Sequence, residues 1–99
     1  MMNTGGTYMV SWNPGDFVSS KAGHDKGQTY IIIRETEEYI YLSDGKIRSL
    51  DKLKKKNKKH VQPIGHADEG IRRKLKDGET VRNEEVKRAI KCYLSKVHQ

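Results

Sequence analysis

Two neighbouring segments of this chain are suited to little besides β-structure. Residues 28–35 read QTYIIIRE, a nearly continuous run of β-branched and aromatic side chains, and residues 38–43 read EYIYLS. The first pattern is typical of a strand buried on both of its faces. In the second, Ile40 and Leu42 alternate with two tyrosines, which predicts a strand with one buried face. Any fold of this chain has to accommodate these two strands side by side.

Three further segments have the length and composition of short strands, at residues 15–20 (GDFVSS), 46–50 (KIRSL) and 60–64 (HVQPI). Asp44-Gly45 is predicted to be a tight hairpin turn that leads into the second of them. Pro63 lacks a backbone N–H, so its strand should lie at an edge or an end of the sheet. Five short strands in about 50 residues predict a mostly β fold, namely a small five-stranded barrel.

The hydrophobic period changes after the last strand. Asp68 is expected to cap a short helix that places Ile71 and Leu75 on one face and ends at Gly78. A second helix is expected from Asn83, with an apolar stripe that packs on the barrel or on a partner: Val86, Ile90, Tyr93, Leu94 and Val97. The predicted organisation is a flexible arm over residues 1–13, with Trp12 fixing it to a barrel over 14–65, and a helical extension over 66–99.

The positive charge of the chain is concentrated in one place. The formal net charge is +7, and residues 46–60 contain seven lysines and Arg48 against a single acid, Asp51. The remaining residues carry 12 basic and 12 acidic side chains, so the whole excess lies in this stretch. A neutral protein with one strongly basic segment is expected to have a polyanionic partner. The alternative for the lysine-rich part, predicted as a loop over 52–59, is a solvated segment without a partner.

Other function classes receive little support. The chain of 99 residues suits one domain, no apolar run approaches the roughly 20 residues of a membrane span, and the first residues do not resemble a signal peptide. We therefore expect a cytoplasmic protein that has no membrane partner. Cys92 is the only cysteine, and the four histidines lack metal-ligand spacing. With no phosphate-binding glycine loop or nucleophile motif, we expect no enzyme, no catalytic residues, no metal, no cofactor and no small-molecule substrate. The oligomeric state stays open.

One ordered motif points to a family. From residue 14 the chain reads PGDFVSSKAGHDKGQTYIII, which resembles the KOW motif: a G-D-x-V strand, a loop ending in lysine-glycine, and an apolar strand. The matching residues are Gly15, Asp16, Val18, Gly23, Lys26, Gly27 and Ile31 to Ile33. Its continuation, with Asp44-Gly45, Arg48 and a lysine-rich segment ending at His60-Val61, is similar to ribosomal proteins of the fourteen-e type and to their small bacterial RNA-binding relatives. The resemblance covers residues 14–64. It implies an SH3-like barrel and a ribosome-associated RNA-binding protein of translation, with rRNA as its partner.

The residues predicted to contact RNA come from three segments. They are Lys21, His24 and Lys26 in the first loop, Lys46 and Arg48 after the hairpin turn, and Lys52, Lys54, Lys55, Lys56, Lys58, Lys59 and His60 in the lysine-rich segment. Lysine suits backbone phosphates and reads bases poorly, so structured RNA recognised by shape is expected. If four to six lysines engage, the log–log salt slope of binding should be about −3 to −5.

Several residues admit a second interpretation. Arg48 is either a bidentate phosphate donor or a cross-strand partner of Glu38. His24 and His60 either contact RNA or are ordinary loop histidines, and Tyr39 and Tyr41 either stack on bases or cover the barrel. For the whole protein, the alternative is a protein-interaction module of the transcription or translation machinery that uses the SH3-like barrel. Such a module predicts an apolar groove and salt-insensitive binding, whereas a nucleic-acid enzyme would need a carboxylate cluster for metal.

Overall fold

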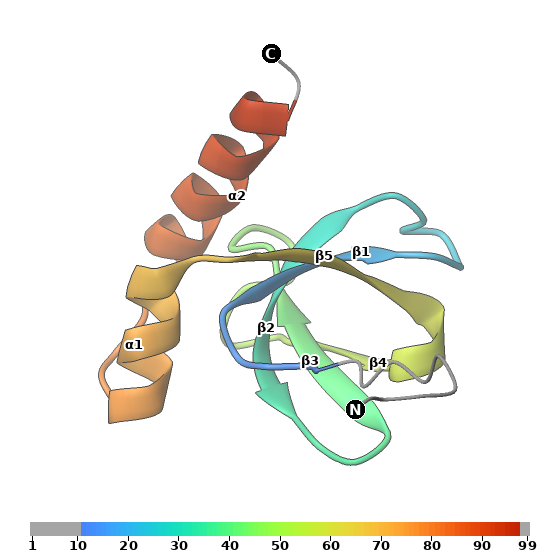
Figure 1. Ribbon diagram of the computed structural model, residues 1–99, viewed down its shortest axis with the longest axis horizontal. Coiled ribbons are helices and arrows are strands. Elements are labelled where there is room, and N and C mark those ends of the chain that lie inside the picture. Colours follow the sequence, from blue (N-terminus) through green and yellow to red (C-terminus); the bar gives the residue numbers. More distant parts are fainter. Residues whose placement is uncertain (1–10, 98–99) are drawn as a thin grey trace, which may run out of the picture.

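The computed structural model describes residues 11–97, which form five strands followed by two helices (Figure 1). The elements are β1 (Asp16–Ser20), β2 (Thr29–Glu35), β3 (Tyr39–Ser43), β4 (Lys54–Asn57), the 3₁₀ helix η2 (Lys58–His60), β5 (Val61–Ala67), α1 (Glu69–Asp77) and α2 (Asn83–Val97). The strands form one antiparallel sheet in the order β4-β3-β2-β1-β5. Of the predicted N-terminal arm, residues 1–10 lie outside the described part. Trp12 packs, as expected, on a cluster of core residues.

The sheet is curved, but it is not closed into a barrel (Figure 1). Within residues 11–97 its two edge strands, β4 and β5, do not pair with each other, and η2 joins them instead. The backbone N–H of Lys58 donates to the carbonyl of Glu38 (3.0 Å), and the N–H of Lys21 donates to the carbonyl of His60 (2.8 Å). The expected closed barrel is therefore wrong, because a helical turn occupies the place of the closing ladder. With two C-terminal helices, the fold is mixed α/β rather than mostly β.

Each face of the sheet has its own core, and this arrangement follows from the alternation of the strands. The inner face carries Val18, Tyr30, Ile32, Ile40, Leu42 and Val61, all at most 4% exposed. The outer face contributes Phe17 and Ile31, which pack against Ile71 of α1 and against Val86 and Ile90 of α2. The apolar run of β2 thus supplies both cores, as predicted. In Figure 1 the two helices lie together at one side of the curved sheet.

The strand predictions hold for β1, β2, β3 and β5 but not for the fourth strand. Pro63 lies in the edge strand β5, as expected. Residues 46–50 form a loop, and the strand that pairs with β3 is β4, inside the segment that was expected to be a loop. The reason lies at Asp44, whose Oδ1 accepts hydrogen bonds from the N–H groups of Lys46 (2.8 Å) and Arg48 (2.9 Å). This side-chain turn takes the backbone out of the ladder. Ile47, within this loop, is 82% exposed.

The helix predictions are confirmed in their main features. The Asp68 carboxylate caps α1 by accepting from the N–H of Ile71 (2.9 Å), and α1 ends at Gly78. The stripe of α2 packs on the sheet except at its end, where Val97 is half exposed. Ion pairs fix both helices: Arg72 contacts Asp16 of β1, and Lys74 contacts Glu85 at 2.6 Å. The hydrogen bond from Lys74, followed by that from the backbone of Arg82, lowers the pKa of Glu85.

Candidate nucleic-acid interface

The lysines of β4 alternate between two environments because successive side chains of a strand point to opposite faces. Lys54 and Lys56 lie opposite Leu42 and Ile40 of β3, on the inner face of the sheet. Their side chains are only 24% and 11% exposed, so they form part of the wall of the inner core. Lys55, between them, is exposed on the outer face. The formation of β4 therefore places lysines that look equivalent in the sequence in two different environments.

Asp25 of the β1–β2 loop is the partner of the two inward lysines. Its carboxylate lies 3.0 Å from Nζ of Lys56 and 3.6 Å from that of Lys54, and accepts hydrogen bonds from Tyr30 (2.9 Å) and Ser20 (3.0 Å). Burial by itself raises the pKa of Asp25, but the three hydrogen bonds and the charge of Lys54 outweigh it and hold the pKa well below its usual range. Lys54 and Lys56 are thus engaged in closing the open side of the sheet.

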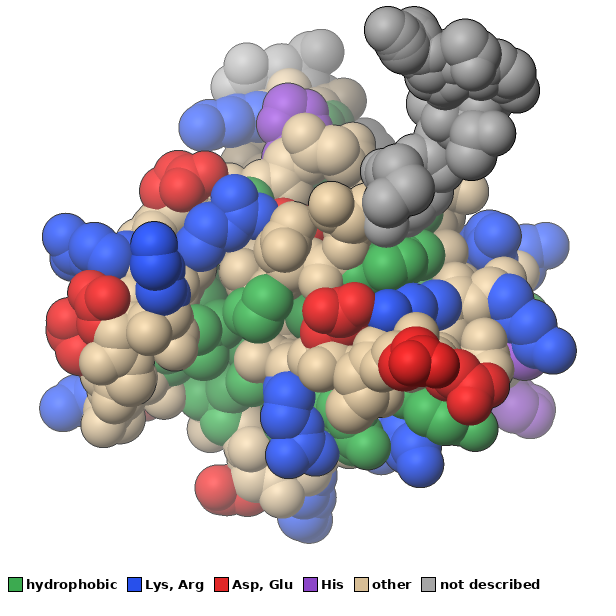
Figure 2. Space-filling model, turned by 60° about the horizontal axis from the view of Figure 1, so that its bottom comes forward, with side chains coloured by type: hydrophobic (Ala, Val, Ile, Leu, Met, Phe, Trp, Pro, Cys, Tyr) green, Lys and Arg blue, Asp and Glu red, His purple; other side chains and the backbone are tan. Residues whose placement is uncertain are grey.

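Lys58 is also engaged within the fold. Its Nζ lies 2.6 Å from a carboxylate oxygen of Glu35 and 2.9 Å from the carbonyl of Glu37, at the β2–β3 turn. Figure 2 shows the face at the bottom of Figure 1, where acidic and basic side chains are interspersed around an apolar area. This face is not uniformly positive, because the fold places acidic side chains of other segments next to some of the lysines of the lysine-rich segment.

The outer face of β2, β3 and β4 carries two cation–aromatic contacts. Nζ of Lys55 lies 4.2 Å from the ring centroid of Tyr39, and the guanidinium of Arg34 lies 4.1 Å from that of Tyr41. Arg34 was not among the predicted residues. Strict alternation would place it on the inner face with Ile32, but an irregularity in register between these two residues turns it outward, opposite Tyr41. The sequence gives no direct signal of this bulge.

The β1–β2 loop and the turn after β4 lie close together, at one end of the sheet (Figure 1). The hydrogen bond between Lys21 and His60 joins their backbones, and the side chains of Lys21, His24, Lys26, Lys59 and His60 are exposed. In the described part of the chain, the lysines of this group make no ion pair. Two predicted segments, far apart in the sequence, thus form one surface.

The remaining predicted residues lie elsewhere. Lys46 belongs to the 44–50 loop, which lies against α2, and Lys52 is exposed between that loop and β4. Arg48 is half-buried and makes no ion pair with Glu38, so the cross-strand alternative for this residue is not formed. Its carbonyl instead accepts a 2.7 Å hydrogen bond from the buried hydroxyl of Ser43.

Two further findings concern metal-ligating side chains and membrane spans in the described residues. Within residues 11–97, no three His, Cys, Asp or Glu side chains are placed to hold a metal ion, and Cys92 is exposed. No helix of this part is both long and apolar enough to span a bilayer. Comparison with known proteins found neither a family model nor a curated protein that matches the chain.

Proposed function

We propose that this protein binds structured RNA through one basic surface, and that its partner is rRNA on the ribosome. In this proposal the basic surface joins the β1–β2 loop and η2, whose backbones are linked by the Lys21–His60 hydrogen bond, with the outer face of β4, the strand that directly precedes η2. Its side chains are Lys21, His24, Lys26, Lys55, Lys59 and His60. In this proposal it is a cytoplasmic binding protein rather than an enzyme.

The observation that carries this proposal is that only some lysines of the lysine-rich segment are paired with acids of the fold. Lys54, Lys56 and Lys58 face acids of the fold, whereas Lys55 and Lys59 point outward and have no acidic partner among the described residues. An exposed ammonium group gains from phosphate contact because it releases counterions from the nucleic acid. Beside it, the tyrosine rings on β3 offer flat surfaces on which an unpaired base could stack once a cation moves aside. Phosphate contacts with few base readers suit recognition by shape.

The strand arrangement supports the finer fold assignment that we propose, an SH3-like arrangement of the KOW type. The fifth strand returns to pair with the first, and the loop with the lysine-glycine pair joins β1 to β2. Gly27 of that pair has a φ of 88°, a conformation that glycine adopts readily.

A charge-reversal experiment tests the function. The triple variant Lys21→Glu, Lys55→Glu, Lys59→Glu should lose most of its affinity for a blunt RNA hairpin, and its log–log salt slope should flatten by about 2 to 3, at 0.7 to 0.9 per lost phosphate contact. The control reverses three exposed helical cations instead: Arg73→Glu, Lys76→Glu and Lys96→Glu. Thermal melting checks that both variants are folded.

The outcomes separate the candidate functions. Loss of hairpin binding and of ribosome cosedimentation in the first variant alone supports the proposal. Equal losses in both variants would mean that only net charge matters, which contradicts it. Ribosome association that is insensitive to salt and unchanged in the first variant would favour the protein-interaction module.

A further inference from the structure

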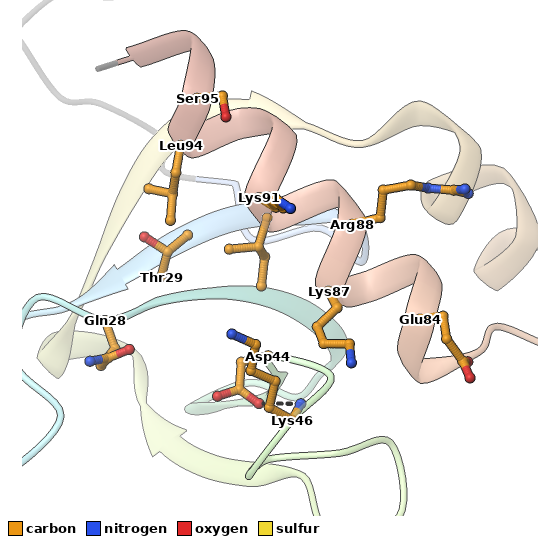
Figure 3. Close-up of a pocket in the computed structure, with 11 residues that line it drawn as sticks. Gln28, Thr29, Asp44, Lys46, Glu84, Lys87, Arg88, Lys91, Leu94 and Ser95 are labelled. Carbon is orange, nitrogen blue, oxygen red and sulfur yellow. Dashed lines mark hydrogen bonds between the residues drawn. The ribbon is translucent and has the colours of Figure 1, made fainter. Parts of the chain in front are cut away.

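A groove of about 890 Å³ runs between α2 and the loop of residues 44–50. This volume is within the roughly 300–1,000 Å³ of ligand pockets in proteins. One wall is the exposed side of α2, and the other is formed by Lys46 and by the start of β2 at Gln28 and Thr29. Figure 3 shows Lys46 and Lys87 projecting from opposite walls into the space between α2 and the loop, whereas Arg88 extends away from it. The groove is therefore open to solvent and lined by cations on both sides.

The charges of the groove favour an anionic occupant. Lys46, Lys87 and Lys91 are exposed, and none of them makes an ion pair within residues 11–97. The groove also contains two acids. Asp44 is engaged in hydrogen bonds to the backbone of its own loop, and Glu84 belongs to the first turn of α2, where a carboxylate complements the helix dipole. The lysines, in contrast, have no such structural task.

The groove is held open by close packing at its end. Gly45 has a φ of 74°, and a Cβ added to it would lie 2.5 Å from the carbonyl oxygen of Asn83 and 2.9 Å from the backbone nitrogen of Lys87. The side chain of Asn83 in turn accepts a hydrogen bond from the N–H of Leu50 (2.8 Å). Loop and helix are thus locked together, so a ligand would meet a preformed site and lose little entropy in ordering it.

We propose that this groove binds a single-stranded segment of RNA that continues from the RNA held on the basic surface. This inference rests on the proposed function. Gln28, in the wall of the groove, is the last residue of the β1–β2 loop and lies two residues from Lys26 of the basic surface, so the groove begins where that surface ends. Lysines on both walls suit the phosphates, and the partly exposed Leu94 provides apolar surface for a sugar or a base face.

The test compares two RNAs, a blunt hairpin and the same hairpin with a single-stranded tail of about eight nucleotides. For the unaltered protein, the tail should increase affinity and steepen the log–log salt slope by about 1.4 to 2, as two or three single-strand phosphates would at roughly 0.7 each. In the variant Lys87→Gln, Lys91→Gln, most of this additional slope should disappear, with Lys46 as the one groove lysine left, while the affinity for the blunt hairpin stays within about twofold. Lys76→Gln, Lys96→Gln serves as the control with equal charge.

The outcomes distinguish this inference from the proposed function. Hairpin binding with no gain from the tail, or a gain that survives in the groove variant, overturns the inference and leaves the proposed function standing. Binding of neither RNA overturns both. An acidic peptide that competes for the groove as strongly as the tail would identify a protein partner instead, and would also overturn the inference.

Discussion

The replacement Asp25→Asn should destabilise the protein more than any substitution among its exposed charges. The carboxylate has four partners, including Lys56 at 3.0 Å, and the two side chains are only 14% and 11% exposed. Removing one partner of a buried ion pair costs about 3–5 kcal/mol, because the other charge remains buried and uncompensated. Since Lys56 keeps its hydrogen bond to the carbonyl of Ala22 and some access to water, we expect a loss of about 2–4 kcal/mol.

That loss is large relative to the total stability of a domain of this size, about 5–15 kcal/mol. Urea denaturation should show a lower midpoint with an unchanged m-value, and the melting temperature should fall by about 10–25 °C. A double-mutant cycle with Lys56→Met should show a coupling energy of about 1–3 kcal/mol, because the double variant no longer contains the unpaired charge. A loss below about 0.5 kcal/mol for Asp25→Asn, or additive effects in the cycle, would refute the structural role assigned to this pair.

Three further predictions concern the pH dependence of stability, the two faces of β4 and the packing at Gly45. Because the fold lowers the pKa of Asp25, the stabilisation is complete above the ordinary carboxyl pKa of about 3.9 and is lost as the pH falls below it, so acid titration of unfolding should be less steep for Asp25→Asn than for the unaltered protein. Lys55→Gln should weaken RNA binding and change the free energy of unfolding by less than about 0.5 kcal/mol. Lys56→Gln should lower the free energy of unfolding by about 1–2 kcal/mol. Equal effects of the two variants in urea denaturation would contradict the division of β4 into two faces. Gly45→Ala should lower the free energy of unfolding by about 2–3 kcal/mol, because alanine is strained at this φ and the added Cβ also clashes with α2. Gly78 has the same φ of 74° but nothing within 4 Å of the added Cβ, so Gly78→Ala should cost only about 1 kcal/mol. Urea denaturation should therefore show a larger loss for the first variant.

Local sequence patterns were sufficient for most of the elements. The β-branched run of β2, the alternation in β3, the cap at Asp68 and the apolar stripe of α2 each act within a few residues, so they can be read without knowing the rest of the fold. The fourth strand could not be predicted in this way. The side chain of Asp44 competes for the backbone of residues 46–48, and the lysines of β4 have low strand propensity, so only pairing with β3 makes them a strand.

By itself, the sequence determined where the excess positive charge lies, because charge is a property of composition and position. The tertiary structure decided which of those charges face solvent. Lys56 and its partner Asp25 are 31 residues apart, and folding brings them to 3.0 Å, while Lys55 turns to the other face of the same strand. Whether a lysine stabilises the fold or is available to a partner depends on whether the fold places an acid beside it. The free energy of such an ion pair depends on its burial, which cannot be predicted from a local sequence pattern.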